Sequence, residues 1–388
     1  MINYELDEYL IEAVYQNKLK RVKYLLKLGA NPNARYEGKG NSCLAIAKKM
    51  GLGDIVEALE KRDAKEIKAD ECYAKKLGER IFSLGAEDKD EIVKLFLLGA
   101  DLEVKNILGD TLFLDAVRNS KYTITDMLID FGADIHAVTK AGRNALFYAV
   151  RYFQPDLFLD LMERGVDVHL VDKDGYNMLH VAIDCPVGGE RLLKLIERGV
   201  NLNQREKNTG FTPLGIACLW ENSYSALKLI EAGCDVNICN NRGKMPLLWV
   251  ADSSIMKVEV LEAMLEHGAD IDYEGYMNIT ALGWALKKVS PSNKNSWKKV
   301  ALLIEYGAKI KDSELEVINN KSKSDGVGDL IEEAFVKRDE RIKKKEEERK
   351  KKEEEILRRK KEEEEKVLKE MNEKKIKSTW WNRILRSR

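Results

Sequence analysis

The segment MLIDFGADIHAVTKAGRNALFYAV, residues 127–150, contains the pattern that decides the fold of this chain. The same phrase returns 33 residues later as LMERGVDVHLVDKDGYNMLHVAI, and again as LIERGVNLNQREKNTGFTPLGIA. Its glycine falls at Gly29, Gly99, Gly132, Gly165, Gly199, Gly233, Gly268 and Gly307, and Asp63 takes the place of glycine within the first gap. Such regular spacing between glycines predicts a repeat protein, with nine units over residues 1–320.

Each unit has the composition of two helices joined by a turn. Apolar residues at helical spacing, such as Ile92, Leu95 and Phe96, precede the glycine and predict an amphipathic helix. Glycine then ends that helix, because it adopts a positive φ at little steric cost. After a short extended segment, a second glycine allows the chain to reverse direction. Thr212-Pro213 then supplies an N-cap and a first helical residue for the next helix.

This pattern of two helices and a hairpin resembles the ankyrin repeat, most closely in NTGFTPLGIACLW (208–220) and KDGYNMLHVAI (173–183). The resemblance implies an all-α solenoid that binds other proteins and has no catalytic role. The unit at 65–100 lacks the opening motif, so we expect a kink or fraying near residues 62–90. The predicted domains are the solenoid (1–320), a linker (321–330), a charged helix (331–377) and a basic amphipathic tail (378–388).

The balanced net charge of the chain hides two different regions. Residues 331–388 carry 22 basic and 16 acidic residues, whereas the remaining 330 carry 44 and 50. An acidic solenoid argues against nucleic-acid binding by that part of the chain. The six cysteines form no C-x-x-C pair, and no secretory signal or stretch of eighteen apolar residues is present. We therefore expect a cytoplasmic protein, or one exported by a route that needs no signal peptide.

Catalytic chemistry finds no support in the sequence. His136 and His169 occupy the same slot of successive units, as do Asp134 and Asp167, so the repeat explains these residues better than a catalytic site does. Phosphate-binding, zinc and nucleophile motifs are absent. We predict no enzymatic activity, no cofactor, no metal and no small-molecule substrate.

Large side chains recur at positions that border the concave face in ankyrin-like stacks. One slot of the first helix holds Tyr148, Val181, Ile216, Trp249 and Trp284, and a slot one turn further holds Tyr152 and Trp220. The hairpin tips add Arg143, Lys173, Tyr176, Phe211, Arg242, Tyr273 and Tyr276. We predict that these residues bind a protein segment with apolar anchors and flanking acids. The alternative is that the side chains only pack between neighbouring units.

The C-terminal region predicts a solvated helix. Residues 337–366 contain only three uncharged positions, and Glu346–Lys350 and similar pairs lie at i,i+4. A weak coiled coil is the second interpretation, because Arg349 and Glu363 interrupt its seam. Beyond the helix, residues 374–388 hold six cations and no acid, and the predicted tail contacts are Trp380, Trp381, Arg383, Ile384, Leu385 and Arg386.

The most consistent function is a protein–protein interaction scaffold or adaptor, with the solenoid gripping one protein and the C-terminal helix and tail making a second contact. A membrane tether is one alternative, because a short basic amphipathic segment suits an anionic membrane surface. Another is a regulator that inhibits a partner enzyme by inserting a loop, with EGYMNIT or SPSNKNSW as the insert. The Lys- and Glu-rich chain is also similar to ankyrin effectors of intracellular bacteria. Binding of the tail to its own solenoid, or disorder of the tail, also stays open.

Overall fold

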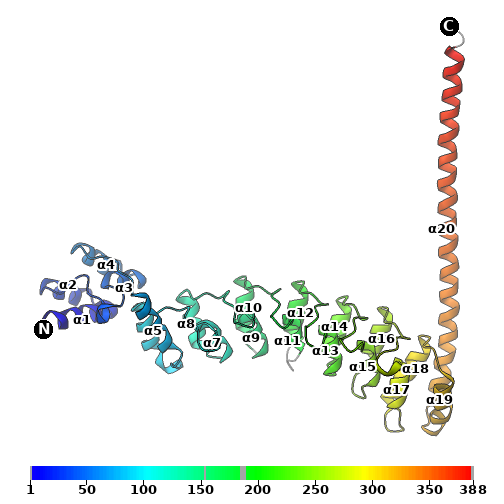
Figure 1. Cartoon of the computed structure of the whole chain (residues 1–388), viewed down its shortest axis with the longest axis horizontal. Helices are drawn as coiled ribbons and strands as arrows, with labels where there is room; N and C mark the ends of the chain where they lie inside the picture. Colours follow the sequence, from blue (N-terminus) through cyan, green and yellow to red (C-terminus); the bar gives the residue numbers. More distant parts are fainter. Residues whose placement is uncertain (1, 153, 184–188, 386–388) are drawn as a thin grey trace. The chain divides into compact units, whose positions relative to one another are not determined.

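The computed structural model describes residues 2–152, 154–183 and 189–385, which fall into two compact units, Met1–Asn241 and Arg242–Arg388. The first unit consists of seven consecutive helix pairs (Figure 1). The helices are α1 (Ile2–Tyr15), α2 (Leu19–Lys27), α3 (Cys43–Lys49), α4 (Gly53–Glu60), α5 (Glu71–Ile81), α6 (Lys89–Leu97), α7 (Leu112–Arg118), α8 (Tyr122–Asp130), α9 (Ala145–Arg151), α10 (Pro155–Glu163), α11 (Met178–Ile183), α12 (Gly189–Glu197), α13 (Pro213–Leu219) and α14 (Ser223–Glu231). Short 3-10 turns, η1 (Tyr36–Gly38) and η2 (Ala86–Asp88), lie in two of the connections.

The second unit contains two further pairs and two C-terminal helices. They are α15 (Pro246–Asp252), α16 (Val258–Glu266), α17 (Ala281–Lys287), α18 (Lys294–Glu305), α19 (Asp312–Ser324) and α20 (Gly328–Leu385), with the 3-10 turn η3 (Tyr276–Asn278) before α17. The nine pairs confirm the nine predicted units, and the described part of the chain is all-α with two isolated β-bridges.

The glycine at the end of each pair behaves as predicted. All eight have φ between +72° and +105°, and Asp63 adopts the same left-handed conformation with φ +58°. A backbone N–H from just past the glycine then bonds back into the helix, as from Ala133 to Leu128 O at 2.9 Å. These residues therefore end the second helix of every unit, because the helix cannot continue through a positive φ.

The predicted hairpins are tight turns rather than paired strands. Four successive turns close with a backbone N–H···O bond of 2.9–3.0 Å: Asn106 to Asp110, Thr139 to Arg143, Asp172 to Tyr176 and Glu206 to Phe211. Neighbouring tips are also bonded to each other, as Lys173 N–H is to Ala141 O at 2.9 Å. The tips consequently form a connected edge along the unit.

The core lies between neighbouring pairs and is made by the first helices and the inner faces of the second. The repeated small residues Ala149, Ala182 and Ala217 are at most 2% exposed, as expected where helices approach closely. Thr212 caps α13 by accepting a hydrogen bond from Gly215 N–H at 3.2 Å, and Pro213 is its first residue. Since no single pair could bury both of its faces, stability depends on the stack.

Acidic residues at the repeat slot act as turn formers, which confirms the interpretation of Asp134 and Asp167. Their carboxylates accept from the backbone N–H two residues on, at His136 and His169, at 2.9 and 2.8 Å. The same turn is made by Asn31, Asp101, Asn201, Asp235 and Asp270. The two histidines are thus placed by the repeat.

Polar side chains of one helix pair donate hydrogen bonds to the C-terminal end of the first helix in the preceding pair. The sequence did not suggest this feature. Gln154 Nε2 donates to Val117 O at the end of α7, and Arg191 Nη1 donates to Val150 O on α9, both at 2.8 Å. Lys299 of α18, which is 0% exposed, does the same for α15. These side chains satisfy helix carbonyls that have no partner within their own helix.

The unit at residues 65–100 forms a regular pair, α5 and α6, although its opening motif is missing. Asp70 precedes α5 without a side-chain cap bond, and the stretch before it is held by the preceding unit instead. Lys65 N–H donates to Asn33 Oδ1 at 2.6 Å, and Ala69 N–H donates to Asn41 Oδ1 at 2.8 Å. The predicted fraying is therefore replaced by an irregular but hydrogen-bonded segment.

Most of the predicted linker, residues 321–330, is helical. Helix α19 continues to Ser324, and α20 begins at Gly328. Only a short turn separates them, in which Gly326 has φ +67°. The segment KSKSDGVGD (321–329) has the small and polar residues of a boundary, but its first four residues lie within α19.

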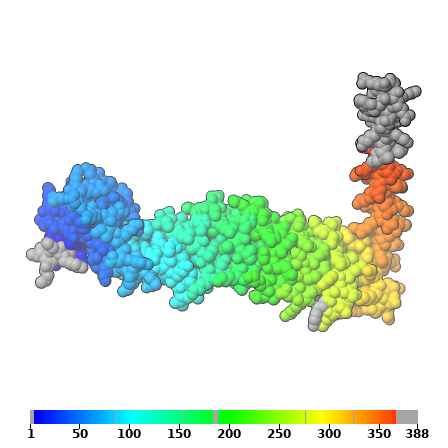
Figure 2. Space-filling view, turned by 45° about the horizontal axis from the view of Figure 1, so that its top comes forward, coloured from blue at the N-terminus to red at the C-terminus, as the bar shows by residue number. Residues whose placement is uncertain are grey.

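The C-terminal helix is longer than predicted, with 58 residues, and at 1.5 Å per residue it extends about 87 Å. Its first turns pack on the unit: Ile331 and Ala334 are 4% and 3% exposed, and Arg341 pairs with Glu305 at 2.8 Å. Residues 342–366 are exposed, as the orange stretch in Figure 2 illustrates. This part of α20 is a helix exposed along its length, and its described ion pairs include Arg349–Glu353 and Arg359–Glu355.

Candidate functional site

A depression of about 450 Å³ lies in the unit Met1–Asn241, between the first helices α9, α11 and α13 and the tips of their turns. We call it the aromatic groove. Six of its ten lining residues stood in the slots predicted to bind a partner, namely Arg143, Tyr148, Tyr176, Val181, Ile216 and Trp220. The other four, Phe147, Arg151, Asp174 and Asn208, were not predicted.

Trp220 and Tyr152 are the exposed aromatic residues of this region. Trp220 ends α13 with 49% of its surface exposed, and Tyr152 follows α9 with 38% exposed. The ring of Tyr152 stacks on that of Tyr148, with centroids 6.2 Å apart and planes 12° apart. Tyr152 is therefore held in place by its neighbour while its outer face remains open to a ligand.

Tyr148 and Ile216 lie deeper than a surface stripe would require. They are 8% and 4% exposed, so they form the base of the groove rather than projecting anchors. Burial raises the pKa of the Tyr148 hydroxyl. The floor is consequently apolar and neutral, whereas the large accessible area belongs to the residues one turn further along the helices.

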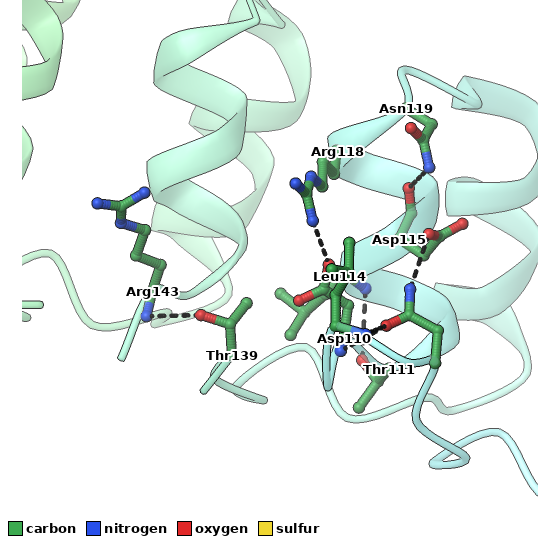
Figure 3. Close-up of polar contacts among 10 residues, drawn as sticks. Asp110, Thr111, Leu114, Asp115, Arg118, Asn119, Thr139 and Arg143 are labelled. Atoms are coloured by element: carbon green, nitrogen blue, oxygen red, sulfur yellow. Dashed lines mark hydrogen bonds and ion pairs between the residues drawn. The ribbon is translucent and has the colours of Figure 1, made fainter. Parts of the chain in front are cut away.

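Cations beside the groove are already paired with buried carboxylates. Arg143 Nε lies 2.8 Å from Asp172 Oδ2, and Arg118 Nη1 lies 2.8 Å from Asp110 Oδ2, with both aspartate side chains at most 2% exposed. Figure 3 shows Arg118 directed at Asp110, and the Arg143 backbone N–H donating to Thr139 Oγ1. The Arg118 guanidinium also lies 5.9 Å from the centroid of the Tyr148 ring. Arg143 and Arg118 thus orient the aromatic wall while contributing little net charge.

Tyr176 and His180 form the wall contributed by α11 and its turn. Their rings meet edge to face at 5.3 Å. Burial lowers the pKa of His180 to about 4, so the imidazole is neutral at pH 7. One ring nitrogen lies 2.7 Å from Asn177 Oδ1 and the other 3.3 Å from Phe211 O, which ties α11 to the next turn. His180 is therefore a structural residue.

Phe211 and Lys173 do not line the groove, although both were predicted partner-binding residues. Phe211 is half-buried over Gly215, where an added Cβ would come within 2.9 Å of its ring. Lys173 is exposed at its tip, and its backbone N–H bonds to the neighbouring tip. Phe211 thus packs locally, and Lys173 remains an accessible cation beside the groove.

In the unit Arg242–Arg388, Trp249 and Trp284 flank a lysine of the same chain. Lys244 Nζ lies 3.6 Å from the Trp249 ring centroid and 4.9 Å from that of Trp284. Lys244 also pairs with Asp252 at 3.6 Å, and burial lowers its pKa. The space between the two indoles is therefore filled from within, which favours the packing interpretation for this pair.

The remaining predicted residues of this unit lie on its turns. Tyr273 donates its hydroxyl proton to Gly243 O at 2.9 Å, which fastens one turn to the next. Arg242 is exposed, and Tyr276 begins η3, with its side chain outside the described residues. The side chains of the predicted tail contacts also lie outside the described residues: Trp380, Trp381, Arg383, Ile384, Leu385 and Arg386.

Neither a metal site nor a membrane-spanning helix is found among the described residues. Histidine, cysteine and acidic side chains do not gather anywhere in threes with metal-binding geometry across this part of the chain. Among its helices, none combines the length and the apolar character needed to cross a bilayer.

Known proteins share features of this sequence and fold. Residues 82–170 and 152–238 match the family model described as ankyrin repeats (3 copies). A similar solved structure is the ankyrin repeat domain of Bcl-3, described as a unique member of the IkappaB protein family, with 21% identity, 58% of this chain and 96% of that chain covered, and a TM-score of 0.46. The human ASB11 ankyrin repeat domain has 21% identity, covers 61% of this chain and 99% of its own, and has the same TM-score. No curated protein matched. On the family match, residues 82–238 of this chain consist of ankyrin repeats.

Proposed function

We propose that this protein is a non-catalytic adaptor that binds a segment of another protein in the aromatic groove. The observation that carries the proposal is the pair of exposed aromatic residues, Tyr152 and Trp220, beside a depression of about 450 Å³. Aromatic residues that are exposed in the free protein bury a large area on binding at a low cost in side-chain entropy. Ankyrin-type repeats use such extended surfaces for recognition.

The chemistry of the groove favours a partner segment with an apolar anchor. Val181 and Ile216 offer an apolar base that suits an uncharged anchor, and Arg143 is neutralised by Asp172. The exposed cations Lys140 and Lys173 lie on the adjacent tips and suit acidic residues that flank the anchor. Rim pairs of this kind contribute more to the association rate than to affinity.

The test is capture of partners by the full chain carrying Tyr152→Ala and Trp220→Ala. We expect proteins bound by the wild type to be lost from this variant, while its thermal unfolding is unchanged, because both side chains are exposed. The matched control is Tyr122→Ala with Tyr224→Ala, which removes aromatic residues that are 54% and 47% exposed on second helices of the same unit. Equal capture by both variants in quantitative mass spectrometry rejects the groove as the binding site.

A second contact through α20 has its own support. The helix is fixed at its base by Arg341 and Glu305, and it then continues through solvent as a spacer of about 1.5 Å per residue. The basic segment at its end is the proposed contact with a second protein. A membrane tether is the alternative, tested by flotation of the full chain with anionic and with neutral liposomes. Flotation with anionic liposomes that disappears on deletion of residues 367–388 supports the tether, and its absence rejects it.

A further inference from the structure

A separate depression of about 290 Å³ lies at the N-terminal end of the unit Met1–Asn241, lined by α1, α3, α6 and η1. Its base is apolar: Ile11, Ile46, Leu97 and Leu98 are between 1% and 5% exposed. It shares no residue with the aromatic groove and was not foreseen from the sequence. The deepest part of the depression is therefore aliphatic.

The walls of this depression are aromatic and its rim is acidic. Tyr9, Tyr15 and Tyr36 surround the base, and Glu8, Glu12 and Glu37 stand at the edge, against one cation, Lys94. Tyr9 is half exposed, with the Arg21 guanidinium 5.8 Å from its ring centroid, and Lys94 Nζ lies 5.7 Å from the ring centroid of Tyr36.

Two of the carboxylates are held in place without being neutralised. Glu37 accepts a hydrogen bond from the Tyr73 hydroxyl at 2.8 Å, and Glu12 accepts one from Gln16 Nε2 at 2.5 Å. The ion pairs found among the described residues of the unit include neither of them, nor Glu8. The rim therefore presents fixed negative charge that an incoming group can still compensate.

The depression continues into a second one of about 240 Å³, which shares Glu8, Ile11 and Glu37 with it. The second depression adds Asp7, while its cation, Arg35, is bound to Asp70 at 2.7 Å. Together the two depressions form what we call the N-terminal groove. Acidic residues line both parts of it.

An apolar base, tyrosine walls and a carboxylate rim suit one kind of side chain. Lysine and arginine carry a long aliphatic stem that packs on apolar surface, and a charged head that remains at the edge. The head can lie over a tyrosine face and donate hydrogen bonds to carboxylates, and such charge-assisted bonds are the stronger ones. An acidic segment would be repelled, and a purely apolar one would bury the rim carboxylates without a counter-ion.

We infer that the N-terminal groove binds a basic segment of a partner protein, with a lysine or arginine stem on Ile11 and Leu98 and its head at Glu8 and Glu12. This site is independent of the aromatic groove, since the two lie on different helices. The adaptor would then hold two segments of opposite character, one apolar with flanking acids and one basic.

The test measures binding of a fluorescent peptide of alternating lysine and alanine to the full chain, by polarisation at low salt. The variant Glu8→Gln with Glu12→Gln removes two charges at nearly constant size. The control variant, Glu163→Gln with Glu190→Gln, removes two exposed charges elsewhere in the same unit. We expect the rim variant to bind on the order of tenfold more weakly and the control to bind within about twofold of wild type.

Several results would overturn the inference. Equal weakening in both variants would mean attraction by net charge alone, and no binding by the wild type would mean no such site. A peptide with norleucine in place of lysine that binds equally well would leave only an apolar pocket. Tighter binding to a chain shortened after residue 366 would make the basic end of this chain the occupant.

Discussion

Replacement of Lys299 by methionine tests how the stack is held together. The side chain is 0% exposed, and its ammonium donates to Val250 O at 2.7 Å and to Ser253 O at 2.6 Å. Both carbonyls lie at the C-terminal end of α15, where the helix dipole favours a cation and where backbone acceptors have no partner in their own helix. Methionine keeps most of the stem and its packing, but cannot donate.

The size of the effect follows from two opposed contributions. Each hydrogen bond to a charged group contributes about 1.5–3 kcal/mol, so the two bonds together give about 3–6 kcal/mol. Burying the ammonium costs several kcal/mol in the wild type, and the methionine variant avoids that cost. Because both carbonyls would lose the Lys299 ammonium as a donor, we expect the loss of the two bonds to outweigh the relief of desolvation, with Lys299→Met less stable by about 2 kcal/mol.

Urea unfolding followed by tryptophan fluorescence measures this difference, since Trp249, Trp284 and Trp297 belong to the same unit. The control is Lys298→Met, the adjacent exposed lysine, which we expect to stay within about 0.5 kcal/mol of wild type. A Lys299→Met variant as stable as wild type, or more stable, would refute the reasoning. It would show that desolvation of the ammonium outweighs its two bonds.

Three further changes test the repeat itself. Asp63→Gly should stabilise the chain by about 0.5 kcal/mol in urea unfolding. The reason is that relief of the left-handed backbone strain at φ +58° exceeds the added entropy of the unfolded chain. A less stable variant would contradict this. Gly132→Ala, at φ +82°, should cost about 1–2 kcal/mol by the same measurement, whereas Gly53→Ala, at the start of α4 with open space around it, should not destabilise. Burial lowers the pKa of His180 to about 4, so the neutral imidazole contributes to the free energy of unfolding in a pH-dependent way. The contribution is fully present above pH 6.5, and about 3 kcal/mol of it is lost as the pH falls from 6.5 to 4. His180→Gln should be less pH-dependent than wild type over that range, and equal slopes would refute the assignment.

The architecture was predictable because it depends on backbone conformations that few residues adopt. A glycine at each helix end and a Thr-Pro start are local signals, and both acted as expected at Gly132 and Thr212. Even Asp63 was placed correctly, since spacing alone required a left-handed residue there. Local rules were sufficient wherever the cause lay within a few residues along the chain.

Contacts between neighbouring repeats were harder to predict from the sequence, because spacing along the chain does not show which side chains meet. Lys244 stands two residues after Arg242, a predicted binding residue, but it lies between Trp249 and Trp284 and fills the space between the two indoles. The Arg191 bond to Val150 O joins residues 41 apart, and no short motif announces it. The sequence identified the slots, and only the packing showed which side chains were already occupied.

Occupancy, rather than residue type, therefore separates binding residues from structural ones in a repeat protein. Trp249 and Trp220 are both tryptophans on the first helix of a pair or at its end, but Trp249 is covered by a lysine of its own chain whereas Trp220 is 49% exposed. The same distinction applies to charge: Arg143 is neutralised by a buried aspartate, whereas Glu8 stands at an acidic rim without an ion pair among the described residues. In a stack whose backbone is fixed by recurring glycines, the side chains left without an internal partner are the ones free to recognise another protein.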